Sequence, residues 1–294
     1  MTVKPDTVMS SSSAEGGGKG FNPFPGLRPF RIDESHLFFG REGQSEEVLE
    51  NLSKNRFVGV IGSSGSGKSS LMYCGLVPIL HGGFITEAGS KWRIIASRPG
   101  SAPIDNLAAA IAQDELPDAS DEDLKVRHAM TQAILKSSTK GLVETIKHMD
   151  RKADENVLIL VDQFEELFRF RKSENAQNAY NDAVAFVKLL LTAVKQNEVP
   201  IYIVITMRSD FIGECSQFQE LTKLINDSHY LIPQMTRRDI TQAIEGPIAV
   251  GGGQISHQLV QRLLNDIGDK QDQLPILQHA LMRTWDYWTR FSSK

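Results

Sequence analysis

The sequence predicts an α/β fold in which a doubly wound parallel sheet is followed by a small helical domain. Five short apolar runs alternate with helical patterns over the first 235 residues, and strands that are separated by helices form parallel sheets. From Thr236 onward the pattern is helical only. We therefore expect a sheet domain over residues 21–235 and a helical domain over residues 236–294.

The expected strands lie at residues 57–61, 92–97, 157–162, 201–206 and 229–232. Helices are expected near residues 42–53, 178–195, 256–267 and 275–288, with two or three more between residues 104 and 149. The third strand is apolar on both faces, as a strand inside a parallel sheet must be. In the helical domain, Thr236 and Asp239 form a capping box that starts a helix, and Gly246-Pro247 is expected to end it.

The composition narrows the class of protein. Of the 294 residues, 40% are hydrophobic and 23% are charged, and the net charge is −4, so no overall basic field favours nucleic acid as a partner. No apolar run approaches the roughly 18 residues of a membrane span, and Cys74 and Cys215 fit no metal or redox spacing. We expect a cytoplasmic protein with no membrane partner. The Ser/Gly-rich residues 1–20 are expected to form a disordered leader.

One glycine-rich stretch joins the first strand to a helical pattern with the spacing Gly-x-x-x-x-Gly-Lys-Ser. This order of strand, loop and helix is that of a phosphate-binding P-loop, or Walker A motif. Gly62, Gly65 and Gly67 are expected to allow positive φ so that backbone N–H groups surround a polyphosphate. The residues expected to bind nucleotide here are Gly62, Ser63, Ser64, Gly65, Ser66, Gly67, Lys68, Ser69 and Ser70.

Charged residues follow the ends of the third and fourth strands. Asp162 has the position of a Walker B carboxylate, which together with the Ser69 hydroxyl would hold Mg²⁺. Glu165 and Glu166 lie just beyond, where one of them could act as general base or both could favour the dipole of the next helix. The spacing does not choose between them. Arg208 could sense a γ-phosphate or form a plain ion pair with Asp210.

These motifs together resemble the bacterial novel STAND NTPase 1 family. Beside the P-loop, the matching segments are PGLRPF at 25–30, FGRE at 39–42, RPG at 98–100, DQFEEL at 162–167, RSD at 208–210, EGP at 245–247 and LPILQHAL at 274–281. The resemblance runs from about residue 21 to residue 288. It implies a nucleotide-driven signalling switch that ADP holds closed and that ATP opens for self-association, with slow Mg²⁺-dependent hydrolysis of ATP.

The resemblance also implies individual roles. Gly40 and Arg41 match a segment that contacts the base or ribose, and Pro275 matches a proline that packs near the adenine of bound ADP. Arg208 matches a sensor arginine and Asp162 the Mg²⁺ carboxylate. The implied sheet order is 5-1-4-3-2. Members of this family usually continue into further domains, so the helical domain is expected to be truncated.

Two other functions remain open from the sequence. The first is a scaffold that binds nucleotide without hydrolysing it and acts through partner proteins. The second is an ATPase of the AAA+ type that associates with DNA. A GTPase is not indicated, because the sequence has no Asn-Lys-x-Asp motif to read guanine.

Overall fold

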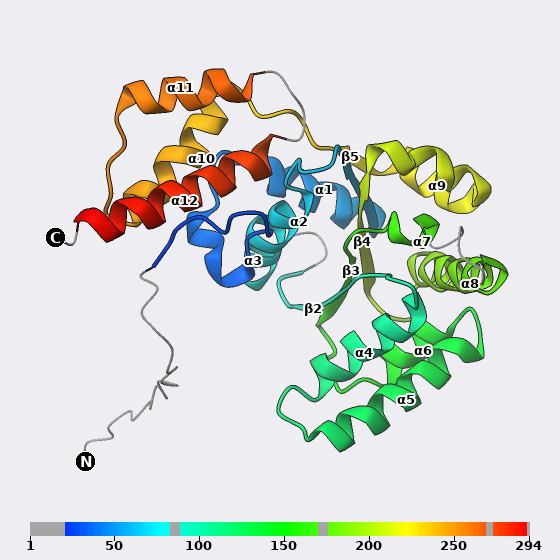
Figure 1. Cartoon of the computed structure of the whole chain (residues 1–294). Helices are drawn as coiled ribbons and strands as arrows, with labels where there is room; N and C mark the ends of the chain where they lie inside the picture. Colours follow the sequence, from blue (N-terminus) through cyan, green and yellow to red (C-terminus); the bar gives the residue numbers. More distant parts are fainter. Residues whose placement is uncertain (1–20, 83–88, 170–175, 269–272, 293–294) are drawn as a thin grey trace, which may run out of the picture.

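A five-stranded parallel sheet forms the centre of the molecule (Figure 1). The computed structural model describes residues 21–82, 89–169, 176–268 and 273–292, so the predicted leader lies outside the described residues. The strands are β1 (Phe57–Gly62), β2 (Trp92–Ser97), β3 (Asn156–Val161), β4 (Ile201–Arg208) and β5 (His229–Leu231). Their order is β2-β3-β4-β1-β5, which is the predicted order read from the other edge. The predicted fold class is confirmed.

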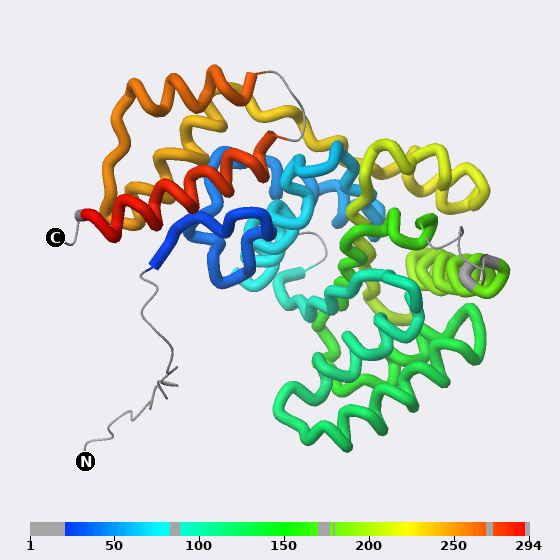
Figure 2. Tube along the Cα trace, viewed as in Figure 1, coloured from blue at the N-terminus to red at the C-terminus, as the bar shows by residue number. Residues whose placement is uncertain are grey.

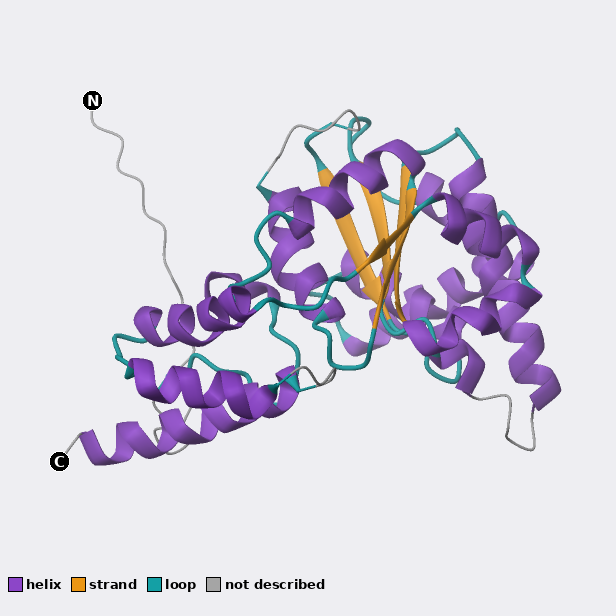
Figure 3. Ribbon diagram, turned by 90° about the horizontal axis from the view of Figure 1, so that it is seen from above, coloured by secondary structure: helices purple, strands orange, loops and turns teal. Residues whose placement is uncertain are grey.

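Helices cover both faces of the sheet (Figure 3). One face carries α4 (Pro103–Glu115), α6 (Gly141–His148), α8 (Ala176–Lys195) and α9 (Gln219–Asp227), with α5 (Asp121–Ser137) packed against α4 and α6. The other face carries α1 (Gln44–Asn55) and the helix that follows the P-loop. That helix comprises α2 (Lys68–Ser70), a π-helical segment (Leu71–Leu76) and α3 (Val77–His81).

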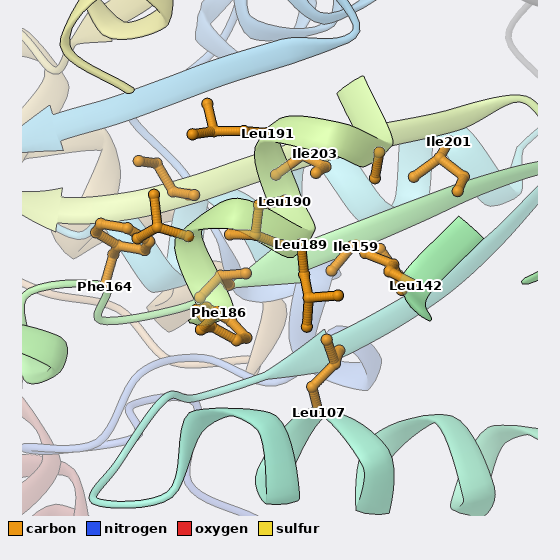
Figure 4. Close-up of a cluster of buried hydrophobic side chains, with 14 of the residues drawn as sticks. Leu107, Leu142, Ile159, Phe164, Phe186, Leu189, Leu190, Leu191, Ile201 and Ile203 are labelled. Carbon is orange, nitrogen blue, oxygen red and sulfur yellow. The ribbon is translucent and has the colours of Figure 1, made fainter. Parts of the chain in front are cut away.

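Each face of the sheet has its own hydrophobic core. Successive side chains of a buried strand point alternately into one core and the other. Ile159 and Val161 of β3 point into the core beneath α4, α6 and α8, whereas Leu158 and Leu160 point to the opposite core. Figure 4 shows the first of these cores, in which Leu107 and Phe186 approach the strands from their helices. Burial of β3 on both faces explains why its sequence is apolar from Val157 to Val161.

Three further helices pack beside the sheet region and share a core of their own (Figure 1). They are α10 (Arg237–Val250), α11 (His257–Ile267) and α12 (Leu274–Ser292), and we call them the helical unit. The predicted capping box is present: Asp239 N–H donates to Thr236 Oγ1 over 3.2 Å, and Thr236 N–H donates to Asp239 Oδ2 over 2.8 Å.

The predicted end of α10 at Gly246-Pro247 is wrong, because the helix continues to Val250. Proline inside a helix removes one backbone hydrogen bond. Here Pro247 and its neighbour Ile248 are buried, and this burial offsets the lost bond. The helix ends instead at Gly251, whose N–H donates to the Pro247 carbonyl over 3.0 Å.

The segment 21–30 connects the helical unit to the sheet region. Phe24 is 3% exposed and lies in the core of the helical unit, and Trp285 Nε1–H donates to the Phe21 carbonyl over 2.9 Å. At its other end, Phe30 N–H donates to Ser70 Oγ in the helix after the P-loop over 3.2 Å. Figure 2 shows this segment, in dark blue, running along α12, in red.

Two short 3-10 helices and one short α-helix complete the described elements: Ile32–Leu37, Ser209–Gln217 and α7 (Glu166–Arg169). None of the described helices combines the length and the apolar character that crossing a membrane requires.

Candidate nucleotide and metal site

The P-loop lies at the carboxyl end of β1 and leads into α2. Gly65 and Gly67 have φ of +68° and +88°, which L side chains rarely adopt. Gly62 does not have positive φ, in contrast to the sequence prediction, and is instead the last residue of β1. A Cβ at Gly62 would lie 2.8 Å from Ser66 Oγ, so glycine is needed there for space.

Lys68 folds back onto its own loop. Its ammonium group donates to the carbonyl oxygens of Gly62 over 2.9 Å and Ser63 over 2.6 Å, and the residue is 8% exposed. Burial lowers the pKa of Lys68, while the nearby Glu165 carboxylate acts in the opposite direction. A cation held in this way at a helix N-terminus is placed to meet a polyphosphate.

Asp162 is the centre of a hydrogen-bond network at the carboxyl end of the sheet strands. Its carboxylate is fully buried, and Oδ1 accepts from Ser69 Oγ and from Thr206 Oγ1, each over 2.7 Å. Its Oδ2 accepts from Arg98 Nε and Nη2 over 3.1 and 3.0 Å. The structure therefore brings together Ser69 and Asp162, the two residues that the sequence predicts as metal ligands.

The oxygen atoms of Ser69 and Asp162 fit Mg²⁺, which prefers hard oxygen donors and retains water ligands. Across residues 21–292, within the described ranges, no group of three or more His, Cys, Asp or Glu side chains could form a metal site from protein atoms alone. A cation at Ser69 would therefore need phosphate oxygens and water to complete its shell, as it does in other P-loop proteins.

Sequence reasoning missed Arg98 and Thr206 as partners of Asp162. Arg98 follows β2 and Thr206 lies near the end of β4, and these strands flank β3 on its two sides. In a parallel sheet the carboxyl ends of neighbouring strands meet at one edge. A polar residue within the otherwise apolar end of β4 was the available signal for Thr206.

The two candidate bases, Glu165 and Glu166, have different surroundings. Glu165 is 6% exposed, and its Oε2 accepts from the backbone N–H of Arg208 over 3.3 Å. Burial raises the pKa of Glu165, partly opposed by backbone hydrogen bonds and by Lys68. Glu166 instead accepts from the backbone N–H of Gly100 over 2.9 Å, and thereby holds the loop after β2.

Gln163, directly after Asp162, is a third residue that the sequence analysis missed. Its φ of +61° is unusual for a side chain with a Cβ, and its N–H donates to Thr206 Oγ1 over 2.9 Å. Strained backbone of this kind is concentrated at functional sites. Gln163 lines the same cavity as Glu165.

Arg208 makes the ion pair with Asp210 that the sequence left as an alternative. Its Nε and Nη2 donate to the two carboxylate oxygens over 3.0 and 2.8 Å, and its guanidinium lies 5.7 Å from the centre of the Phe211 ring. Arg208 also lines the cavity beside Lys68. Arg208 therefore pairs with Asp210 and also lies at the site.

Of the residues implied by the family resemblance, Arg41 and Pro275 line the cavity and Gly40 does not. Arg41 is 6% exposed and donates to the carbonyl oxygens of Pro233 over 2.7 Å and Ser66 over 2.8 Å. Gly40 has φ of +82°, and a Cβ there would lie 2.3 Å from the carbonyl oxygen of Asp239. It allows its segment to approach α10 closely.

A cavity of about 340 Å³ is lined by Lys68, Ser69 and Glu165, whereas Asp162 is not a lining residue and reaches it through Ser69 and Thr206. Its polar end contains the P-loop from Ser64 to Ser70 with Glu165 and Arg208. Its apolar walls come from Pro25, Leu27, Pro29, Phe30, Leu37, Phe38, Phe39, Met235, Ala243, Leu274, Pro275 and Leu277. A neighbouring cavity of about 540 Å³ shares Arg41 and Ser66 but contains neither Lys68 nor Glu165, so we place the chemistry in the first.

A P-loop beside a buried strand-end aspartate on a parallel sheet of this order defines the class of P-loop nucleoside triphosphatases. The sequence model of the novel STAND NTPase 1 family matches residues 23–293. The chain belongs to this family, as the sequence motifs predicted. No curated protein sequence compared with the chain matches it.

Solved structures with a similar fold include P-loop ATPases. The Walker-type ATPase PABY2304 of Pyrococcus abyssi is 14% identical, with a TM-score of 0.51 over 89% of this chain and 72% of that one. The ORC1 protein of Aeropyrum pernix, solved in complex with DNA, is 13% identical, with a TM-score of 0.54 over 86% of this chain and 61% of that one. At such low identity these similarities support the fold alone.

Proposed function

We propose that this NTPase is a slow Mg²⁺-dependent ATPase that serves as the switch core of a signalling protein. The observation that carries the proposal is the composition of the cavity. The P-loop, the Ser69 hydroxyl and the Glu165 carboxylate share it with apolar walls to which the helical unit contributes Ala243, Leu274, Pro275 and Leu277. A nucleotide has two ends that are complementary to these: a polyanionic phosphate chain and a flat aromatic base.

In this proposal each polar residue has a distinct task. The loop N–H groups and Lys68 bind the phosphates, with Lys68 exchanging its loop carbonyl partners for phosphate oxygens. Ser69 and Asp162 hold Mg²⁺, which when bound neutralises developing charge on the phosphates. Arg208 senses the γ-phosphate, and the stacking on Phe211 limits the positions of its guanidinium.

We assign the general base to Glu165 rather than Glu166. Glu165 lines the cavity and its pKa is raised by burial, both of which suit a carboxylate that accepts a proton from attacking water. The Glu166 carboxylate instead accepts a hydrogen bond from the backbone N–H of Gly100. Gln163 lies in the same cavity and could orient the water through its amide.

The switch follows from which parts of the chain a nucleotide would touch. Arg41 and Pro275 lie in one cavity but belong to the sheet region and the helical unit respectively, so a bound ADP would contact both. A ligand shifts a conformational equilibrium only through such differential contacts. We propose that ADP favours the closed arrangement and that ATP, with a trigger outside this chain, permits self-association in the cytoplasm.

The test is to identify the nucleotide released when the purified protein is denatured, and then to measure phosphate release from added Mg²⁺-ATP. We expect ADP in the released fraction and slow turnover. A protein that contains ADP and releases no phosphate would instead be the nucleotide-locked scaffold. A protein that neither contains nor binds adenine nucleotide would contradict the proposal.

A further inference from the structure

One polar residue of the helical unit lines the cavity and has a buried amide oxygen that accepts no hydrogen bond from the described residues. Gln278 lies on α12, one turn beyond Leu274, and lines the cavity. Its amide oxygen Oε1 is buried and accepts no hydrogen bond from any of the described residues. A buried acceptor without a donor costs free energy, so a rotation of this amide that brings its oxygen to a ligand donor in the cavity would be favourable.

The surroundings of Gln278 point to the kind of ligand. The other cavity-lining residues that α10 and α12 contribute within the described ranges are all apolar: Ala243, Leu274, Pro275 and Leu277. Phe39 enters from the segment before α1 and packs against α10, since a Cβ at Gly246 would lie 2.5 Å from the Phe39 ring. A flat aromatic ring fits such walls, and Gln278 supplies their one amide.

We infer that Gln278 reads the base of the bound nucleotide and selects adenine. The inference rests on the proposed nucleotide binding. A primary amide presents an acceptor and a donor side by side, which complement the N6 amino group and N7 of adenine. Guanine and hypoxanthine carry a carbonyl oxygen at position 6 beside N7, so both of their atoms are acceptors and the amide oxygen would face another oxygen.

The test compares ADP with inosine diphosphate, which has a carbonyl in place of the 6-amino group. Binding of each, with Mg²⁺, is measured by calorimetry for the parent chain and for Gln278→Met, which keeps the length of the side chain and removes the amide. We expect the parent to prefer ADP by roughly tenfold or more. In Gln278→Met, ADP should bind roughly tenfold more weakly and inosine diphosphate nearly as before, so the preference disappears.

Two further variants make the result specific. Gln258→Met makes the same chemical change at an exposed position of α11 and should keep the preference of the parent. Gln278→Glu keeps an acceptor for the 6-amino group and should still prefer ADP, even if the negative charge weakens both ligands; it also serves if Gln278→Met does not fold.

An unchanged preference for ADP in Gln278→Met would overturn the inference, and so would an equal loss of both ligands. If the parent binds neither diphosphate, the proposed function itself fails, and that outcome is distinct because it appears before any substitution at Gln278.

Discussion

The polar end and the apolar end of the cavity are built in different ways. At the polar end, Asp162 joins Ser69, Thr206 and Arg98 by hydrogen bonds, and these groups lie on adjacent segments at one edge of the sheet. At the apolar end, Phe39, Met235 and Leu274 come from segments far apart in the chain. The first end is held within the sheet region, whereas the second combines residues before α1 with residues of the helical unit.

In the proposed switch, this difference separates the groups for chemistry from those for conformational control. Substitutions at the polar end should change hydrolysis and phosphate affinity without altering how the helical unit sits. Substitutions at the apolar end should change the retention of nucleotide and leave the chemical groups in place. The following experiments test this separation, from the largest expected effect to the smallest.

Glu165→Gln should slow ATP hydrolysis by on the order of a hundredfold or more, because an amide keeps the shape of the side chain but accepts no proton. ATP binding should persist. Phosphate release and calorimetry measure the two effects, and Glu166→Gln is the matched control, with hydrolysis within a few-fold of the parent. Equal rates for the parent and Glu165→Gln would remove Glu165 from the role of base.

Lys68→Ala should reduce the affinity for Mg²⁺-ATP by about tenfold to a hundredfold, since hydrogen bonds to a charged group contribute roughly 1.5–3 kcal/mol each. Calorimetry measures this, and thermal unfolding checks that the buried position tolerates alanine. Lys136→Ala, on α5, is the control. Unchanged affinity would contradict the assignment of the P-loop.

Asp162→Asn should make nucleotide affinity nearly independent of Mg²⁺, because the amide keeps an acceptor for the neighbouring hydroxyls but loses the charge that holds the cation. Titrations with ADP in the presence of Mg²⁺ and in the presence of a chelator measure the difference. A variant that responds to Mg²⁺ as strongly as the parent would show that the cation is held elsewhere.

Pro275→Glu should speed ADP release by about tenfold, since an apolar contact in a ligand pocket is worth roughly 1–3 kcal/mol. Displacement of a fluorescent ADP analogue measures the rate. Ile276→Glu places the same charge on the next residue of α12, which is 58% exposed, and should leave the rate close to that of the parent. Equal effects of the two substitutions would place α12 outside the binding of the base.

The smallest effect concerns pH. Because burial raises the pKa of Glu165, the folded chain binds this proton more tightly than the unfolded chain does. Its contribution to the free energy of unfolding is complete below the ordinary glutamate pKa and is lost as pH rises through the raised value. Glu165→Gln should therefore gain stability relative to the parent as pH rises above the ordinary glutamate pKa of about 4.3.

Urea unfolding at several pH values measures this trend. Glu50 supplies a control of opposite sign, because the hydrogen bond from Lys54 lowers the pKa of Glu50. Its favourable contribution is present above the ordinary pKa and is lost as pH falls. Glu50→Gln should therefore lose stability relative to the parent as pH rises, and a parallel trend for the two variants would refute the assignment at Glu165.

The sequence predicted most of the polar end because its signals are local. The P-loop spacing and the apolar run before Asp162 each occupy a single stretch, so neither depends on knowing the partner strands. Arg98 and Thr206 escaped prediction as partners of Asp162 because that contact depends on which strands are adjacent. The choice between Glu165 and Glu166 depended on side-chain direction, which two consecutive residues do not reveal.

The apolar end was harder to predict because its residues meet only after tertiary packing. Gln278 was part of a recognised motif but had no assigned role, since only the cavity shows its orphaned oxygen. The error at Pro247 has a related cause: a local rule for ending helices was overridden by burial within the helical unit. The burial of Phe24 in that same core likewise depends on contacts distant in sequence.

The chain passes between the two regions at two places, the segment 21–30 and the stretch between β5 and α10. Phe24 is anchored in the helical unit, and Phe30 is anchored to Ser70 beside the P-loop, so the residues between them form a tether that lines the cavity. A rotation about the second crossing alone would stretch this tether until one anchor detached. Extraction of Phe24 would expose a buried aromatic ring at a cost of roughly 1.5–3 kcal/mol, so in the proposed switch this segment would resist separation of the helical unit from the sheet region.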